Sequence, residues 1–301
     1  MRNRLPVVGV MAAGGEKTVE RFEAGMREHG FIEGRNIRLE VRVAHGDAGK
    51  LAGFAQELVD GGVDLIAVIG AVTARAARSA TSRIPIVYSV VVGPPGDGLA
   101  TPSGDPLPNM TGVTTFDPGQ AQMHLALLRS IKPDLARVAY LADAAVSDCL
   151  ATANVGAAQE AGVHASVLHI VGPAPDLEET FSIMRQDGTQ AIVALENPAI
   201  GTNASRIAER AAALNMPSIF AREQAGLGGL LGYGTSLGRA AYVMARQVSG
   251  VLGGKAPGEI PIETFSAPEL AVDMRTARHL GLTIPPDILR NAVRLNELAD
   301  A

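Results

Sequence analysis

The chain has 301 residues, which is enough for two domains that each bury a core of their own. Apolar residues make up 47% and charged residues 19%, a balance typical of a compact soluble protein and unlike that of a disordered chain. The net charge of −5, with lysine and arginine scattered singly along the chain, argues against a nucleic-acid-binding protein.

The first residues allow two interpretations. Residues 1–4 followed by the apolar run 5–13 resemble the charged region and the core of an export signal. The run is short, however, and leads through Gly14 and Gly15 straight into a helical pattern, which favours a first strand over 5–11. No stretch reaches the roughly 18 consecutive apolar residues that a membrane helix needs. We therefore expect no export signal in this chain.

Strands and helices alternate over the first 90 residues. Predicted strands cover 5–11, 36–43 and 65–69, and a further apolar run starts at Pro85. Helical patterns follow Gly15, Asp47 and Gly70. The segment 64–90 reads strand, glycine turn, helix, strand, and its strands are apolar on both faces. Such strands are typical of a parallel sheet covered by helices, so the segment predicts a doubly wound α/β fold, with 36–43 as a half-exposed edge strand.

A second, similar series follows an irregular loop. Residues 93–108 are too rich in proline and glycine for either element, 109–115 are extended, and a helix over 118–128 marks the first crossing into a second lobe. Strands are then predicted over 137–142, 164–171, 191–195 and 218–221, with helices over 147–161, 176–186 and 203–214. A glycine-dense stretch, 226–234, precedes a helix over 237–252. The last segments return to lobes already built: the extended segments 260–265 and 269–274, a short helix over 276–280 and a polar tail.

Five short motifs in this order resemble one family along nearly the whole chain. They are Phe-Ile-Glu-Gly-Arg-Asn-Ile (31–37), Ala-Thr-Ser-Arg-Ile-Pro-Ile-Val (80–87), Asn-Met-Thr-Gly-Val (109–113), Gly-Gly-Leu-Leu-Gly-Tyr-Gly (228–234) and Ala-Arg-His-Leu-Gly-Leu-Thr-Ile-Pro-Pro (277–286). The chain is similar in these motifs to the ABC-transporter substrate-binding proteins of the tryptophan/tyrosine-uptake type. The resemblance implies a type I periplasmic-binding-protein fold: two Rossmann-like lobes joined by three crossings, with a ligand cleft between them.

The predicted lobes are residues 1–112 with 234–262, and residues 113–233 with 263–301. The resemblance also implies a permease and an ATPase as partners, a monomeric receptor, and a location in the periplasm or at the cell surface; a cytoplasmic location is the alternative. The chain departs from the family in three respects. Gly93-Pro94 stands where the family commonly has Asp-Pro, aromatic residues total only 4% with no tryptophan, and the usual export signal or lipid-attachment cysteine is absent.

Candidate ligand contacts in the first lobe come from loops after strands, because ligands gather at the carboxyl ends of parallel strands. These residues are Ala13, Gly14, Gly70, Val72, Thr73, Ser89 and Val91. Helix N-termini offer free N–H groups there, so a ligand carboxylate is expected at 70–73. The alternative for Thr73 is a cap on its own helix, and the alternative for Gly14 is a simple turn.

In the second lobe the corresponding positions are Asp143, Glu196, Asn197, Arg222, Glu223 and Tyr233. Glu196 and Asn197 directly follow an apolar strand and could receive an ammonium group. A salt bridge across the mouth of the cleft is the alternative role for Arg222 and Glu223. Tyr233, placed in a presumed crossing, supplies the one ring in reach, since Tyr88 and Tyr140 lie inside predicted core strands.

The sequence contains no motif of an enzyme nucleophile, a phosphate-binding loop or a zinc protease. Its one cysteine, Cys149, excludes an intrachain disulfide and a two-cysteine racemase. We therefore expect no catalytic residue, metal or cofactor. The leading hypothesis is the solute-binding component of an ABC importer that closes on an amino acid or related carboxylate. A cytoplasmic ligand sensor or an enzyme on the same fold is the alternative.

Overall fold

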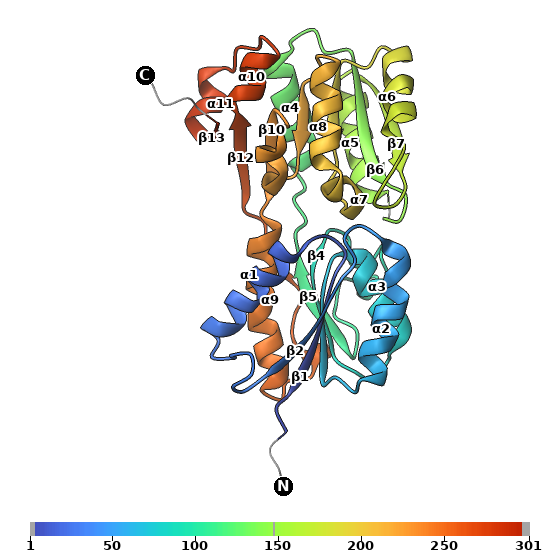
Figure 1. Cartoon of the computed structure of the whole chain (residues 1–301), viewed down its shortest axis with the longest axis vertical. Helices are drawn as coiled ribbons and strands as arrows, with labels where there is room; N and C mark the ends of the chain where they lie inside the picture. Colours follow the sequence, from blue (N-terminus) through green and yellow to red (C-terminus); the bar gives the residue numbers. More distant parts are fainter. Residues whose placement is uncertain (1–3, 147, 297–301) are drawn as a thin grey trace. The chain divides into compact units, whose positions relative to one another are not determined.

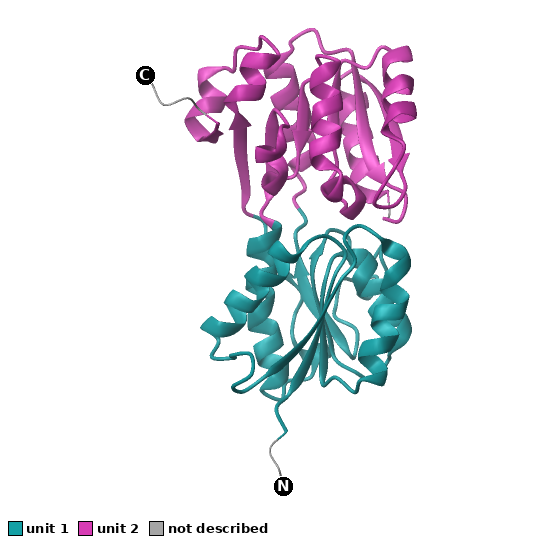
Figure 2. Ribbon diagram, in the orientation of Figure 1, with its two compact units in different colours: residues 1–116, 237–266 teal, residues 117–236, 267–301 magenta. Residues whose placement is uncertain are grey.

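A computed structural model describes residues 4–146 and 148–296. The chain divides into two compact units, coloured separately in Figure 2. Unit 1 consists of Met1–Phe116 and Leu237–Ser266, and unit 2 of Asp117–Ser236 and Ala267–Ala301. The chain thus passes three times between the units, each time a few residues after the lobe boundary given above. Within the described ranges, no helix combines the length and the apolar character needed to cross a bilayer.

Unit 1 is built on a parallel sheet with the strand order β11-β5-β4-β3-β1-β2. In chain order the strands are β1 (Val7–Ala12), β2 (Arg38–Val43), β3 (Leu65–Ile69), β4 (Ile86–Val91), β5 (Met110–Thr114) and β11 (Glu263–Thr264). Figure 1 shows helices α1 (Glu16–Glu28) and α9 (Leu237–Leu252) on one face, and α2 (Leu51–Asp60) and α3 (Ala71–Ala80) on the other. The central strands β1 and β3 are buried throughout, which explains their unbroken apolar runs. The doubly wound fold expected from the sequence is confirmed.

Helices α1 and α9 approach closely because α1 carries a glycine at the contact. A Cβ atom on Gly25 would lie 2.5 Å from the carbonyl oxygen of Tyr242 and 2.8 Å from Cβ of Ala245. Gly25→Ala is therefore expected to lower the free energy of unfolding by about 1–3 kcal/mol, since α9 must move away. Gly156→Ala in helix α5 is the control: its Cβ would meet nothing within 4 Å, and alanine gains up to about 1 kcal/mol of helix propensity. Urea unfolding of both variants tests this, and equal effects would contradict it.

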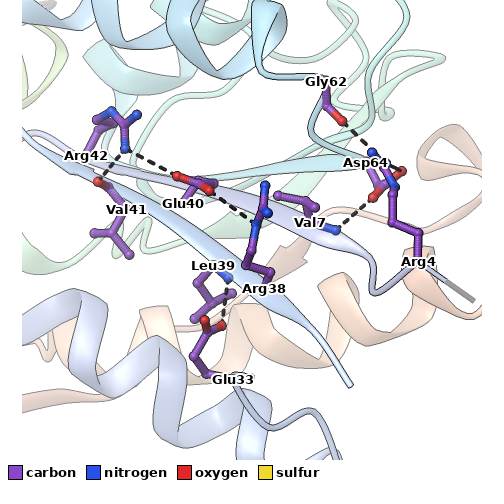
Figure 3. Close-up of polar contacts among 10 residues, drawn as sticks. All are labelled: Arg4, Val7, Glu33, Arg38, Leu39, Glu40, Val41, Arg42, Gly62 and Asp64. Carbon is purple, nitrogen blue, oxygen red and sulfur yellow. Dashed lines mark hydrogen bonds and ion pairs between the residues drawn. The ribbon is translucent and has the colours of Figure 1, made fainter. Parts of the chain in front are cut away.

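Strand β2 forms one edge of this sheet, as the sequence pattern predicts (Figure 3). Arg38, Glu40 and Arg42 alternate along its polar face, with N–O distances of 3.3 Å and 3.8 Å between neighbours. The carboxylate of Glu33 accepts a hydrogen bond from the N–H of Leu39 at 2.7 Å. The charged row and this side-chain bond both disfavour pairing of β2 with a strand from another molecule.

The connection from β4 to β5 has no crossover helix, although it joins parallel strands. Its residues form turns, as the proline and glycine content of 93–108 predicts. Leu99 is fully buried. Asp97 pairs with Arg75 of α3 at 2.6 Å, and its side chain is only 3% exposed. The apolar anchor and the buried ion pair thus fasten this loop to the unit.

Unit 2 contains a mixed sheet with the order β13-β12-β10-β9-β8-β6-β7, in which only the β10–β12 pairing is antiparallel. Its strands are β6 (Arg137–Asp143), β7 (His164–Ile170), β8 (Ala191–Ala194), β9 (Ser218–Phe220), β10 (Leu231–Thr235), β12 (Pro268–Asp273) and β13 (Ala292–Leu295). Its helices are α4 (Gln120–Ile131), α5 (Cys149–Glu160), α6 (Leu177–Gln186), α7 (Pro198–Thr202), α8 (Ala204–Ala213), α10 (Met274–His279) and α11 (Pro286–Asn291), with the 3-10 helix η2 (Arg222–Leu227) after β9. Tyr140 in β6 is fully buried, as predicted, and so is Tyr88 in β4 of unit 1.

Five elements of unit 2 were not predicted: α7, η2, β10, α11 and β13. Strand β10 was not predicted because its glycines are typical of a loop. In the structure these glycines instead permit close packing against neighbouring elements. A Cβ on Gly232 would lie 2.4 Å from Cβ of Ala225 in η2, and one on Gly229 just before the strand would lie 2.3 Å from the ring of Phe220. Tyr233 consequently lies inside a buried strand, so its predicted position in a connecting segment was wrong.

Candidate functional site

The carboxyl edge of the unit 1 sheet carries the loops that the sequence singled out. Gly70 ends β3 with φ +105°, a conformation that favours glycine, and directly precedes α3. Ala74 is the first residue whose N–H bonds back to this turn, to the oxygen of Gly70 at 3.1 Å. The first N–H groups of α3, including those of Val72 and Thr73, therefore offer donors for an anion at this edge.

The hydroxyl of Thr73 is committed to the protein itself. Thr73 is fully buried, and its Oγ1 donates toward the backbone oxygens of Ile69 and Gly70 at 2.8 Å and 2.5 Å. Both partners are backbone carbonyl oxygens and neither is an N–H of α3. The side chain thus ties the start of α3 to the end of β3, and a donor for a ligand here comes from the backbone.

The end of β4 is strained. Val90 has φ +58°, a rare conformation for a β-branched residue, and the β4–β5 register shifts between Tyr88 and Val91. Beside it, the hydroxyl of Ser89 is buried and has no hydrogen-bond partner within the described chain. Thr115, just after β5, carries a second such hydroxyl. The sequence identified Ser89 and Val91 but not Thr115, whose one signal was its place after a short strand.

The turn after β1 is bound to the loop after β2. The N–H of Gly46 donates to the oxygen of Ala13 at 2.7 Å, and that of His45 donates to the oxygen of Gly14 at 3.2 Å. Nε2 of His45 also lies 3.3 Å from a carboxylate oxygen of Glu16. These bonds fix the turn. A Cβ on Gly14 would meet nothing within 4 Å, so this position has space around it.

In unit 2, Glu196 follows β8 and extends toward the end of β10. One carboxylate oxygen lies 3.5 Å from the point where a Cβ on Gly234 would stand, and the side-chain nitrogen of Gln120 lies 3.0 Å from the same point. Gly234 has φ +138°, which also requires glycine. Because Gly234 has no side chain, the side chains of Glu196 and Gln120 can both approach its backbone at the carboxyl edge of the sheet.

Acidic groups surround this point. Burial, and then the nearby Glu223 carboxylate, raise the pKa of Glu196 to about 8. Burial, and then Asp117, raise the pKa of Tyr233. At neutral pH Glu196 is therefore mostly protonated, and a cation placed beside it would favour the carboxylate.

Asp143 and Asn197 shape the loop that carries Glu196. The Asp143 carboxylate accepts hydrogen bonds from the N–H groups of Ala145 and Ala199, each at 2.9 Å. The side-chain oxygen of Asn197 accepts from the N–H of Asp143 at 3.1 Å, and its side-chain nitrogen donates to the backbone oxygen of Glu196 at 3.0 Å. Both residues lie at the predicted place, but their polar atoms bind protein backbone.

Arg222 forms an ion pair with a residue of its own unit, which is not the salt bridge that the sequence suggested. Its Nε lies 3.4 Å from a carboxylate oxygen of Glu269 on β12. Glu223 follows it in η2 and acts electrostatically on Glu196. The two neighbouring charges expected to serve together therefore have different roles.

Tyr233 packs against a histidine that sequence reasoning did not single out. The rings of Tyr233 and His124 meet edge to face, with centroids 5.8 Å apart and an angle of 84°. Nδ1 of His124 lies 3.0 Å from the side-chain oxygen of Asn154. Burial lowers the pKa of His124 to about 4, so the imidazole is neutral at pH 7. This neutral pair supports β10 immediately before Gly234.

Metal binding finds no support in the side chains of residues 4–146 and 148–296, where no three His, Cys, Asp or Glu groups gather closely enough for an ion. Cys149 is exposed at the first position of α5. At its carboxyl edge, the sheet of unit 1 offers backbone N–H donors, and the sheet of unit 2 offers carboxylates.

The chain is similar to known proteins over most of its length. A family model described as "ABC transporter substrate binding protein" matches residues 7–295. A tyrosine-binding protein of Clostridioides difficile (strain R20291) is 22% identical over 270 residues, covering 89% of this chain and 77% of that protein.

Two solved structures show the same fold. A conserved domain protein from Vibrio cholerae has a TM-score of 0.90 and 22% identity, covering 97% of this chain and 99% of that one. An ABC domain from Streptococcus pneumoniae in complex with L-Trp has a TM-score of 0.86 and 20% identity, with the same coverage. These likenesses, together with a leucine-binding protein of the same architecture, show the type I periplasmic-binding-protein fold.

Proposed function

Because the chain belongs to the family of ABC transporter substrate-binding proteins, we propose that it is the receptor of an importer for an amino acid or a related carboxylate. It would capture the ligand as a monomer in the periplasm or at the cell surface, and the ligand would hold the two units closed. A permease and an ATPase would then recognise the closed state. No covalent step is part of this role.

Glu196 carries the proposal. Its carboxyl group stands at the carboxyl edge of the unit 2 sheet beside Glu223 and Gln120, over the bare backbone of Gly234. A ligand ammonium there would gain a charge-assisted hydrogen bond and relieve the repulsion between two carboxylates. Gly93-Pro94 stands where the family commonly has Asp-Pro, so a carboxylate is missing at that position. We therefore place the ligand ammonium at the acidic groups of unit 2.

The ligand carboxylate is assigned to the N-terminus of α3 in unit 1. Gly70 gives the turn its left-handed conformation, and the N–H groups of Val72 and Thr73 provide the donors. The buried hydroxyl of Ser89 is a further donor at this edge. With Ala13, Gly14 and Val91 lining the neighbouring turns, the site would hold both charged groups of an amino acid.

A thermal-shift series tests the pairing of charges. Tyrosine, tryptophan and leucine would be compared with matched compounds lacking one charge, such as tyramine and 4-hydroxyphenylpropionate for tyrosine. An amino acid at about 100 times its dissociation constant should add about 2.7 kcal/mol to the free energy of unfolding, while either half-molecule should add far less.

The panel extends to the remaining amino acids, because the tyrosine-binding protein, the L-Trp complex and the leucine-binding protein named above carry different ones. A rise in melting temperature with amino acids alone supports the proposal. Stabilisation by tyramine equal to that by tyrosine would remove the carboxylate from the site. A flat response to the whole panel would overturn the assignment of the ligand class.

A further inference from the structure

A pocket lies in unit 2 near the amino end of β10, away from Glu196 at the carboxyl edge of the sheet. It has a volume of about 290 Å³ and is bounded by α8, the end of η2 and α10. Strand β12 runs antiparallel to β10, and the N–H of Asp273 donates to the oxygen of Leu230 at 2.9 Å. Helix α10 therefore begins beside the amino end of β10. The pocket is separate from the carboxyl-edge site because the sheet lies between them.

Charges of opposite sign line this pocket. Glu209 on α8 stands on one side, and Arg275 and His279, one helical turn apart on α10, stand on the other. Among residues 4–146 and 148–296, none of the three side chains has a hydrogen-bond or ion-pair partner, and Glu209 does not pair with Arg275. All three side chains are exposed to solvent.

The floor of the pocket is small and fixed. Gly228 has φ +104°, and a Cβ there would lie 3.5 Å from Cβ of Ala208. The buried hydroxyl of Thr276 donates to the oxygen of Gly228 at 3.0 Å, which holds α10 against this turn. Leu227 is 46% exposed at the rim and offers apolar surface beside the charges.

We propose that this pocket binds a small zwitterion, with its carboxylate at Arg275 and His279, its ammonium at Glu209, and its short aliphatic body against Leu227. A guanidinium binds carboxylates through two parallel N–H bonds, and a carboxylate binds ammonium through charge-assisted bonds. The volume is near the lower end for small-molecule sites, which fits a ligand of amino-acid size. This second site does not depend on the ligand assigned to Glu196.

NMR titration of the full-length, ¹⁵N-labelled protein tests the proposal. The probes are the unbranched ω-amino acids from glycine to 5-aminopentanoate, which vary the separation of the two charges. At least one is expected to shift the amide signals of Gly228 and Thr276 in a saturable manner. Acetate and methylammonium, the two half-molecules, should each bind about tenfold more weakly or worse, since a charged contact is lost.

Variants separate the pocket from other effects. Glu209→Gln and Arg275→Gln should each weaken the titration by about tenfold or more. Arg278→Gln is the control on the same helix, since its guanidinium bonds to the oxygen of Asn296 at 3.3 Å, and it should leave the titration unchanged. Shifts that persist in Glu196→Gln belong to the pocket and not to the carboxyl-edge site. The absence of a saturable shift with every probe would overturn the proposal. So would acetate shifts as large as those of the ω-amino acids that stay the same in Glu209→Gln.

Discussion

Glutamine in place of Glu196 is expected to weaken amino-acid binding by about 30-fold at pH 8, corresponding to about 2 kcal/mol for the loss of one partner of a buried charge pair. The loss should shrink as the pH falls. With a pKa of about 8, the carboxyl group is about 99% protonated at pH 6 and then resembles the amide of glutamine. An ammonium ion binds the carboxylate, so the bound ligand must displace that proton.

Wild-type affinity should therefore rise by about fourfold between pH 6 and 7, with less than one proton released per ligand bound. Titration calorimetry in buffers of different ionisation enthalpy measures both quantities. The affinity of Glu196→Gln should be nearly constant over the same range. Glu160→Gln, which alters an exposed carboxyl group at the end of α5, serves as the control. A wild-type affinity independent of pH, or a Glu196→Gln variant that follows the wild type, would place the ammonium elsewhere.

Alanine in place of Arg75 is expected to lower the free energy of unfolding by about 3 kcal/mol, because it leaves a buried carboxylate without its counter-charge. The Asp97 side chain is 3% exposed, whereas that of Arg75 is 35% exposed. Asp97→Asn should cost less, since the guanidinium that remains can reach water. Combining Arg75→Ala with Asp97→Asn should be milder than Arg75→Ala alone, because no charge is then buried.

Urea denaturation of the three variants measures this order. The matched control is Arg290→Ala, which breaks a pair with Asp287 whose side chains are 72% and 82% exposed, and it should change stability by less than about 1 kcal/mol. If Arg75→Ala and Arg290→Ala cost the same, the pair on the β4–β5 loop contributes no more than a surface contact. If the double variant were the least stable, relief of the buried charge would not be the cause.

The sequence predicted the alternating elements because buried parallel strands are continuous apolar runs, as in β1 and β3. It did not predict β13, whose four residues lie in a polar tail and become a strand only by pairing with β12. Strand β10 was missed because its glycines indicate a loop unless one knows that η2 packs against them. Local pattern was sufficient where burial alone determines the element, and failed where a distant partner determines it.

The same division holds for the candidate site. The place of Glu196 was predictable, since it directly follows an apolar strand. The roles of Asp143 and Arg222 were not, because each depends on a partner more than 40 residues away, Ala199 and Glu269 respectively. The edge-to-face contact of Tyr233 with His124 likewise joins elements far apart in the chain. Sequence position shows which side chains reach the edge of a sheet, but the side chains left over for a ligand depend on the tertiary contacts.

The interleaving of the two units also affects how the protein can be made. Unit 1 takes α9 from residues 237–252, and Ala241, Met244, Ala245 and Val248 of that helix complete the core over α1. Unit 2 takes β12 and β13 from the last part of the chain. A ribosome releasing the chain from its N-terminus therefore cannot finish either core until most of the protein has emerged. The surface of α1 that packs against α9 therefore stays exposed until residues 237–252 have emerged, and exposed apolar surface favours association between incompletely folded chains.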